Sequence, residues 1–146
     1  MAAAKARCDY ALFVGASSEN FATIRDLAPE AAGLKMYLNE TFTTLRLKDL
    51  TVWRKHMDAW PMKAPLCVHA EGQTTAAVLL LATFHNRPIH VCHVARKEEI
   101  QIIRAAKEKV RFRNCLFFHT MLEIIYKLMF YCVFFFLIFA GLACYL

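Results

Sequence analysis

The sequence of 146 residues contains little charge, and the charge it has is not clustered. Charged residues make up 21% of the chain and hydrophobic residues 58%. This balance excludes a disordered protein, because disordered chains are polar and highly charged. The net charge is +6, yet Lys and Arg are scattered and nowhere form a run of five. We therefore predict that the chain does not bind nucleic acid.

Two patterns that mark other classes of protein are also missing. None of the six cysteines is spaced as C-x-x-C, which excludes a zinc ribbon and a thioredoxin motif. The residues after Met1 contain no short apolar run that ends in a small-residue cleavage site, so we expect no secretory signal. The cysteines are accordingly expected to be reduced thiols in the cytoplasm.

The composition changes sharply near residue 109. Residues 1–109 hold 15 of the 18 basic residues and 11 of the 12 acidic ones, whereas 8 of the 12 Phe lie beyond them. Residues 128–146 carry no charge at all. We therefore expect a domain over residues 6–109 and a Phe-rich hydrophobic tail over residues 110–146.

The first part alternates short apolar runs with helical patterns. The apolar runs suit buried parallel strands and lie at residues 10–15, 34–38, 65–69 and 88–93. The helical patterns follow them at residues 17–28, 47–60, 73–85 and 98–109. This order requires an α/β fold with a parallel sheet. Four βα units are half of a (β/α)₈ barrel, or most of a small doubly wound sheet.

The third predicted helix is apolar along most of its length. Its inner side is expected to consist of Ala76, Ala77, Leu80, Leu81 and Phe84.

Several polar residues lie at the predicted strand ends, where parallel sheets place their active face. Lys35 falls inside an apolar strand, His69 ends the third strand, and Cys92 and His93 end the fourth. Two imidazoles at neighbouring strand ends can bind one divalent metal such as zinc. Burial disfavours the charged ammonium form of a lysine such as Lys35, so its amine can be neutral. A neutral amine can add carbon dioxide to give a carbamate, and a carbamate can bridge two metal ions. The alternative is that both histidines are hydrogen-bonded structural residues.

The other histidines and the strand-end cysteine have structural interpretations. His56 and His85 lie on predicted helices and are expected to be surface or packing residues. His90 is expected to be structural, because it lies three residues before His93 and on the opposite face of a regular strand. By the same alternation Cys92 points away from His93, so a buried thiol is its default role.

Four segments carry a resemblance to a known family: residues 6–18, 33–42, 68–71 and 89–99. They closely resemble the dihydroorotase domain of the animal trifunctional pyrimidine-synthesis proteins, in the amidohydrolase superfamily. The resemblance runs from about residue 6 to about residue 108. It implies a partial (β/α)₈ barrel of TIM type, from a homo-oligomeric domain that interconverts carbamoyl-aspartate and dihydroorotate with zinc.

The resemblance also implies roles for individual residues. Lys35 matches a lysine that is carboxylated and bridges two zinc ions, and His69 and His93 match two ligands of one of those ions. Cys92 matches a cysteine near an additional metal, which is a weaker correspondence. Thr41 and Phe42 match the tip of a mobile loop that closes on the substrate.

Other parts of the family's active site are missing from the sequence. The family needs a His-x-His pair at the end of the first barrel strand, and no His-x-His occurs anywhere in this chain. It also needs an Asp after the last strand, which binds metal and moves protons, and that strand is absent. We therefore expect a fragment of a zinc-dependent dihydroorotase that has negligible activity alone.

The hydrophobic tail has two interpretations. Residues 128–146 would span about 28 Å as a helix, close to the thickness of a bilayer core. With Lys127 just before this run, the chain can be a membrane-anchored, non-catalytic interaction protein with residues 1–127 in the cytosol. Alternatively the tail results from translation past an exon boundary, because a splice-donor sequence would encode Lys109-Val110-Arg111. We favour the second interpretation.

Overall fold

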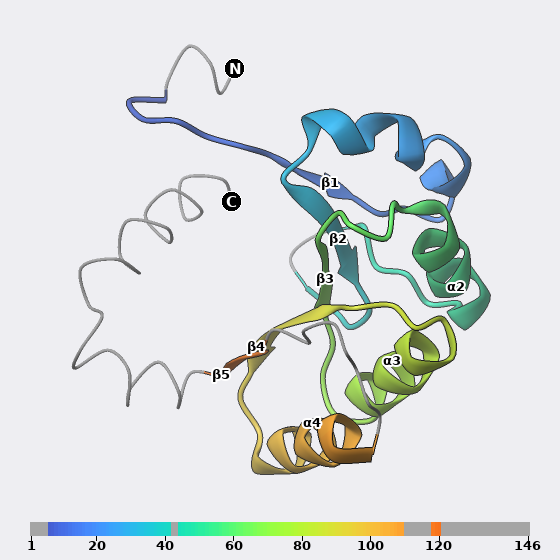
Figure 1. Ribbon diagram of the computed structural model, residues 1–146, viewed down its shortest axis with the longest axis vertical. Helices are drawn as coiled ribbons and strands as arrows, with labels where there is room; N and C mark the ends of the chain where they lie inside the picture. Colours follow the sequence, from blue (N-terminus) through green and yellow to red (C-terminus); the bar gives the residue numbers. More distant parts are fainter. Residues whose placement is uncertain (1–5, 42–43, 110–117, 121–146) are drawn as a thin grey trace.

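The computed structural model describes residues 6–41, 44–109 and 118–120. Within them, five parallel strands form one sheet in the order β1-β2-β3-β4-β5 (Figure 1). The strands are β1 (Phe13–Gly15), β2 (Gly33–Tyr37), β3 (Leu66–His69), β4 (His90–Val94) and β5 (Phe118–Thr120). A doubly wound sheet reverses its strand order at a switch point, and no reversal occurs here. The α/β prediction is confirmed, and the topology agrees with part of a singly wound barrel.

Helical segments connect the strands. Two 3₁₀ helices follow β1, and one α-helix follows each of the next three strands. They are η1 (Asn20–Ala22), η2 (Ile24–Glu30), α2 (Leu50–Ala59), α3 (Gln73–Phe84) and α4 (Lys97–Lys109). Helices α2, α3 and α4 all lie on one side of the sheet (Figure 1). A sheet covered on one side by its crossover helices leaves its second face available for polar side chains.

The first connection differs from the prediction of one continuous helix over residues 17–28. Pro29 lies within η2 and supplies no backbone N–H, which weakens a regular helix there. The Asn20 side chain accepts a hydrogen bond from the Ser17 N–H at 2.9 Å and donates to the Gly15 carbonyl at 2.9 Å. This local network favours short 3₁₀ turns over a longer α-helix.

The two faces of the sheet differ in polarity. Leu34, Met36, Val68 and Val91 are fully buried on the face that the helices cover. The intervening residues point to the other side, because side chains alternate along a strand. We call this side the polar face; it consists of Lys35, Tyr37, Cys67, His69, His90 and Cys92.

Helix α3 packs with a different side from the predicted one. Val78 and Ala82 are fully buried, whereas Leu80 is 56% exposed and Phe84 is 75% exposed. The prediction for Leu80 and Phe84 was therefore wrong. Because eight of the twelve residues of this helix are apolar and three of the polar ones are its first three residues, its sequence contains no polar stripe that identifies the outer side.

A buried arginine holds the loops at the opposite end of the strands together. Arg87 is 1% exposed and donates to the carbonyls of Trp60 at 2.7 Å, Pro61 at 2.9 Å and Ala64 at 3.2 Å. Burial lowers the pKa of Arg87 to about 10. The guanidinium therefore joins the loop before β4 to the loop before β3 through hydrogen bonds to carbonyl oxygens.

Of the two histidines predicted to lie on helices, His56 lies within α2 and His85 is the C-cap of α3. His56 is fully buried, and its Nε2–H donates to the Ser17 carbonyl at 2.8 Å. Burial lowers the pKa of His56, so the neutral ring is the native form. His85 is partly exposed, and its Nδ1 lies 2.8 Å from Asp58 Oδ1.

Strand β5 falls within the segment predicted to be a hydrophobic tail, and it adds a strand beside β4. The proposed membrane-spanning residues 128–146 lie outside the described residues. Among residues 6–41, 44–109 and 118–120, no helix is long and apolar enough to cross a membrane.

Candidate functional site

A row of polar side chains crosses the middle of the polar face. Lys35 on β2 is in register with Cys67 on β3, and Cys67 is in register with His90 on β4. Cys92, two residues beyond His90, therefore points to the same side. Contact with Cys67 first, and with His90 and Lys35, lowers the pKa of Cys92. His90, which the sequence predicts to be structural, lies on the polar face with Lys35 and Cys92.

The two predicted metal ligands meet at the strand ends. The ring centroids of His69 and His93 lie 5.8 Å apart. Regular alternation would place His93 on the helix-covered face beside Val91. Instead His93 has a φ of 58°, a left-handed conformation that non-glycine residues adopt at a cost of about 1–2 kcal/mol. The turn at His93, together with a register irregularity between Val91 and Val94, allows its ring to approach His69.

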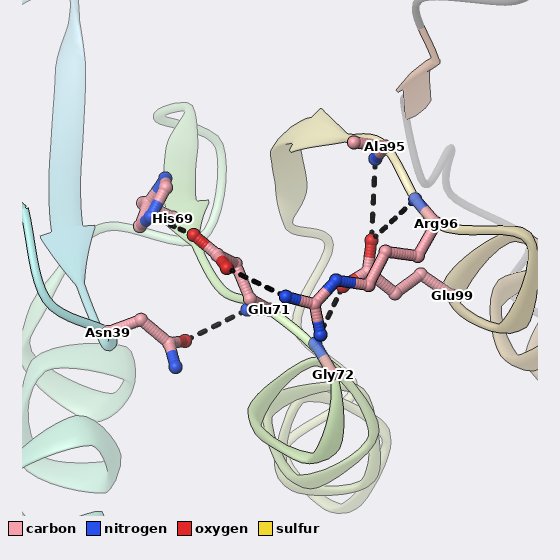
Figure 2. Close-up of polar contacts among 7 residues, drawn as sticks. All are labelled: Asn39, His69, Glu71, Gly72, Ala95, Arg96 and Glu99. Atoms are coloured by element: carbon pink, nitrogen blue, oxygen red, sulfur yellow. Dashed lines mark hydrogen bonds and ion pairs between the residues drawn. The ribbon is translucent and has the colours of Figure 1, made fainter.

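A carboxylate orients His69. The Nε2–H of His69 donates to Glu71 Oε1 at 3.1 Å, and the second oxygen of Glu71 lies 3.5 Å from Arg96 Nη2 (Figure 2). The Glu71 backbone N–H donates to Asn39 Oδ1 at 2.8 Å. Glu71 therefore connects His69 to the ends of β2 and β4 and limits how the imidazole can rotate.

A second carboxylate holds the loop that carries Glu71. Glu99 is 2% exposed, and one of its oxygens accepts a hydrogen bond from the Gly72 N–H at 2.6 Å (Figure 2). The other oxygen accepts from the N–H groups of Ala95 at 3.3 Å and Arg96 at 3.1 Å, at the beginning of α4. Gly72 has a φ of 55°, a conformation that favours glycine. Glu99 thus ties the β3–α3 loop to the N-terminus of α4.

Contacts and burial shift the pKa values of Cys67, Cys92 and His93. The thiol of Cys67 hydrogen-bonds Cys92 and lowers the pKa of Cys92 to about 3, against an opposing effect of burial. The same contact, with burial, raises the pKa of Cys67. Burial lowers the pKa of His93, so its ring is neutral and able to donate an electron pair to a metal.

The residues present supply part of a metal site. Among the described residues, no group of three His, Cys, Asp or Glu side chains can hold a metal ion. The ring separation of His69 and His93 suits two ligands of one ion. Lys35 can complete the set only as a carbamate, because an ammonium group has no free electron pair. The described residues therefore bring two imidazoles together without completing a metal site.

The predicted substrate loop is described only in part. Thr41 is half-buried in the segment after β2, and Phe42 lies outside the described residues. Beyond the tip, Arg46 forms an ion pair with Glu40, and Tyr37 forms an isolated bridge with Arg46. The segment thus returns to the end of β2.

Sequence reasoning missed three residues of this region: Cys67, His90 and Glu99. Alternation along β3 and β4 was a usable signal for the first two, because Cys67 lies two residues before His69 and His90 lies two before Cys92. No sequence pattern predicted that Glu99 is buried, because a glutamate in the first turn of a helix is ordinarily exposed.

Known proteins were compared with the chain in sequence and in structure. No protein-family model matches the sequence. The chain is 57% identical over 109 residues to the multifunctional protein CAD of Squalus acanthias, covering 75% of this chain. It is 51% identical over 116 residues to the multifunctional protein pyr1-3 of Dictyostelium discoideum, covering 79% of this chain. It spans about 5% of the length of each of these relatives.

A solved structure extends the likeness to the fold. The inactive dihydroorotase-like domain of the Chaetomium thermophilum CAD-like multifunctional protein superposes with a TM-score of 0.62 at 32% sequence identity. The match covers 77% of this chain and 32% of that one. Over about three quarters of its length, the chain is therefore similar to part of the CAD multifunctional proteins and to the dihydroorotase-like domain of one such protein.

Proposed function

We propose that residues 6–109 are about four βα units of a (β/α)₈ barrel of the dihydroorotase type, and that residues 110–146 are a hydrophobic tail. The sequential parallel strand order supports the first part of this division. The composition change near residue 109 supports the second. A barrel fragment leaves sheet edges unpaired, so it cannot close its core without further strands.

This fragment is proposed to bind zinc. The proposed ligands are His69, His93 and the carbamate of Lys35. The observation that carries the proposal is the 5.8 Å separation of the two imidazoles at neighbouring strand ends, beyond Lys35 on the polar face. When bound, zinc would polarise the carbonyl of a cyclic amide such as dihydroorotate. Cys92 is a weaker candidate ligand, because its sulfur is engaged with Cys67.

The chain's own residues have distinct tasks in this site. Glu71 holds His69 by accepting its Nε2–H, and a ligand at that nitrogen would displace the contact. The lowered pKa of His93 keeps its ring neutral near pH 7. Thr41 and Phe42, at the predicted loop tip, are proposed to contact the substrate.

Zinc titration of residues 1–146 by calorimetry, with and without bicarbonate, tests the site. We expect binding that strengthens with bicarbonate, since Lys35 contributes only as a carbamate. His69→Ala and His93→Ala should each abolish binding, whereas the matched control His85→Ala should leave it unchanged. Equal binding by the wild type and the His69→Ala/His93→Ala double variant would refute the proposed site.

We further propose that the isolated chain has negligible dihydroorotase activity. The His-x-His pair is absent from its sequence, and the last-strand Asp of the family has no counterpart. Hydrolysis of dihydroorotate by the purified chain with added zinc is the measurement. Activity within tenfold of an intact family domain would show that these residues are dispensable.

A non-catalytic role is the second candidate, and the solved neighbour, a dihydroorotase-like domain described as inactive, favours it. In this role the fragment would be cytoplasmic and would assemble with further copies of the domain, or the tail would attach it to a membrane through residues 128–146. Alkaline carbonate extraction of cell membranes distinguishes the two locations. Release of the chain by alkali would exclude a membrane-spanning tail.

A further inference from the structure

A small cavity lies at the end of the strands opposite to His69 and His93. Its volume is about 270 Å³, and its walls come from η2, the C-terminal ends of α2 and α3, and the loops before β3 and β4. Small-molecule sites begin at about 300 Å³, so this cavity has room for a small ligand. The polar residues that line it are Arg25, Asp58, His85 and Arg87.

The buried Arg87 brings to this cavity a positive charge that no carboxylate of the described residues neutralises. Three of the five N–H groups of its guanidinium donate to backbone carbonyls. The buried Nε–H has no partner among the described residues, and Nη1 has only the Met62 sulfur, a weak acceptor at 3.9 Å, beside its carbonyl. Burial lowers the pKa of Arg87 to about 10, so the group remains charged at neutral pH. Buried charges in proteins are ordinarily paired, and this one lacks an anion.

A second guanidinium lines the same cavity. Arg25 is exposed, and within the described part of the chain it forms no ion pair. The carboxylate of Asp58 is already engaged, because its oxygens lie 2.8 Å from His85 Nδ1 and 3.9 Å from Arg54 Nη1. The lining therefore offers two guanidinium groups against one paired carboxylate, which favours a ligand with negative charge.

We propose that this cavity binds a small organic monocarboxylate, with its carboxylate at Arg25 and Arg87 and its apolar part against Trp60 and Met62. Arginine forms charge-assisted hydrogen bonds with carboxylates, and Trp60 and Met62 supply apolar lining. Met62 is 51% exposed and flexible, so its sulfur can move away from Nη1 to admit a carboxylate oxygen. A dianion such as phosphate is less suitable, because Asp58 repels the additional charge.

Nuclear magnetic resonance titration of the full 146-residue chain, without zinc, tests the site with three probes. Benzoate carries the carboxylate and an apolar ring, benzamide has nearly the same shape without charge, and inorganic phosphate has charge without an apolar part. We expect saturable binding of benzoate that shifts the Nε–H resonance of Arg87, with binding of benzamide and phosphate at least about tenfold weaker. Four results would each overturn the proposal: no saturable benzoate binding, equal binding of benzoate and benzamide, tighter binding of phosphate, or an unmoved Arg87 Nε–H at saturation.

Variants that break no hydrogen bond or ion pair of the described residues locate the binding. Arg25→Gln should weaken benzoate binding about two- to fivefold, because it removes one exposed guanidinium from the cavity. Arg104→Gln is the matched control: it removes an equal charge from an exposed position on α4, outside the lining, and should bind like the wild type. Equal weakening in both variants would mean that benzoate responds only to net charge. The His69→Ala/His93→Ala double variant should also bind benzoate normally, and a loss there would place the anion at the imidazoles instead.

Discussion

Replacement of Glu99 by glutamine removes one charge from the carboxylate that holds the β3–α3 loop to α4. The native side chain accepts hydrogen bonds from the N–H groups of Gly72 at 2.6 Å, Arg96 at 3.1 Å and Ala95 at 3.3 Å. In Glu99→Gln the amide oxygen can keep the Gly72 contact, but the amide nitrogen cannot accept from the other two donors. Glu99 is 2% exposed, so water has little access to replace it.

The expected loss is about 2 kcal/mol of unfolding free energy. Hydrogen bonds to a charged group contribute about 1.5–3 kcal/mol each, and water can partly satisfy the donors of the exposed Ala95 and Arg96. A loss of this size lowers the folded-to-unfolded ratio about 30-fold. Loss of negative charge near the N-terminus of α4 adds about 0.3–1 kcal/mol at low ionic strength.

Glu98→Gln is the matched control for the helix-dipole contribution. Glu98 is exposed in the same first turn of α4, so its replacement changes the charge equally and breaks none of the three hydrogen bonds. Urea titration of both variants, followed by far-ultraviolet circular dichroism, gives the difference directly. If Glu99→Gln and Glu98→Gln have the same midpoint, the carboxylate bridge does not stabilise the fold as reasoned here.

Three further predictions concern other positions. Arg87→Ala should cost about 3–5 kcal/mol, because it leaves buried carbonyls without a donor; a urea midpoint within error of the wild type would contradict this. His56 has a lowered pKa in the folded state, so its stabilisation is complete above the unfolded value of about 6.5 and declines as the pH falls below it. The pH dependence of the thermal midpoint between pH 7 and pH 5 should therefore flatten in His56→Asn, and an unchanged slope would refute the assignment. Gly72→Ala should cost about 1–3 kcal/mol through its positive φ alone, since the added Cβ would meet only the flexible Arg96 guanidinium at 3.4 Å. Thermal unfolding measures this, and a gain in stability would mean that alanine adopts this conformation without strain.

Short-range rules predicted β1 to β4 and the later helices, whereas β5 lies in the segment predicted to be a hydrophobic tail. β2, observed at Gly33–Tyr37, lies one residue from its predicted bounds, because its apolar residues must be buried against the helices. Helix α2 was predicted to end at residue 60, and it ends at Ala59 with Trp60 as its C-cap. The first connection was the exception, because side-chain hydrogen bonds between Ser17 and Asn20 and the proline in η2 outweighed its apolar spacing.

By itself, the sequence determined the α/β class, the parallel sheet and the presence of Lys35, His69 and His93 at strand positions. Alternation and helical periodicity act over a few residues, so they can be read from one segment at a time. Only the tertiary structure decided what meets across segments. The left-handed turn at His93 brings its ring to His69, and the register of β3 with β4 places Cys67 beside His90 and His69 beside Cys92. The tertiary structure also decided which side of the apolar α3 is buried, because that depends on how the helix packs against the sheet. It decided that the Glu99 side chain is buried, because Glu99 accepts a hydrogen bond from Gly72, 27 residues away.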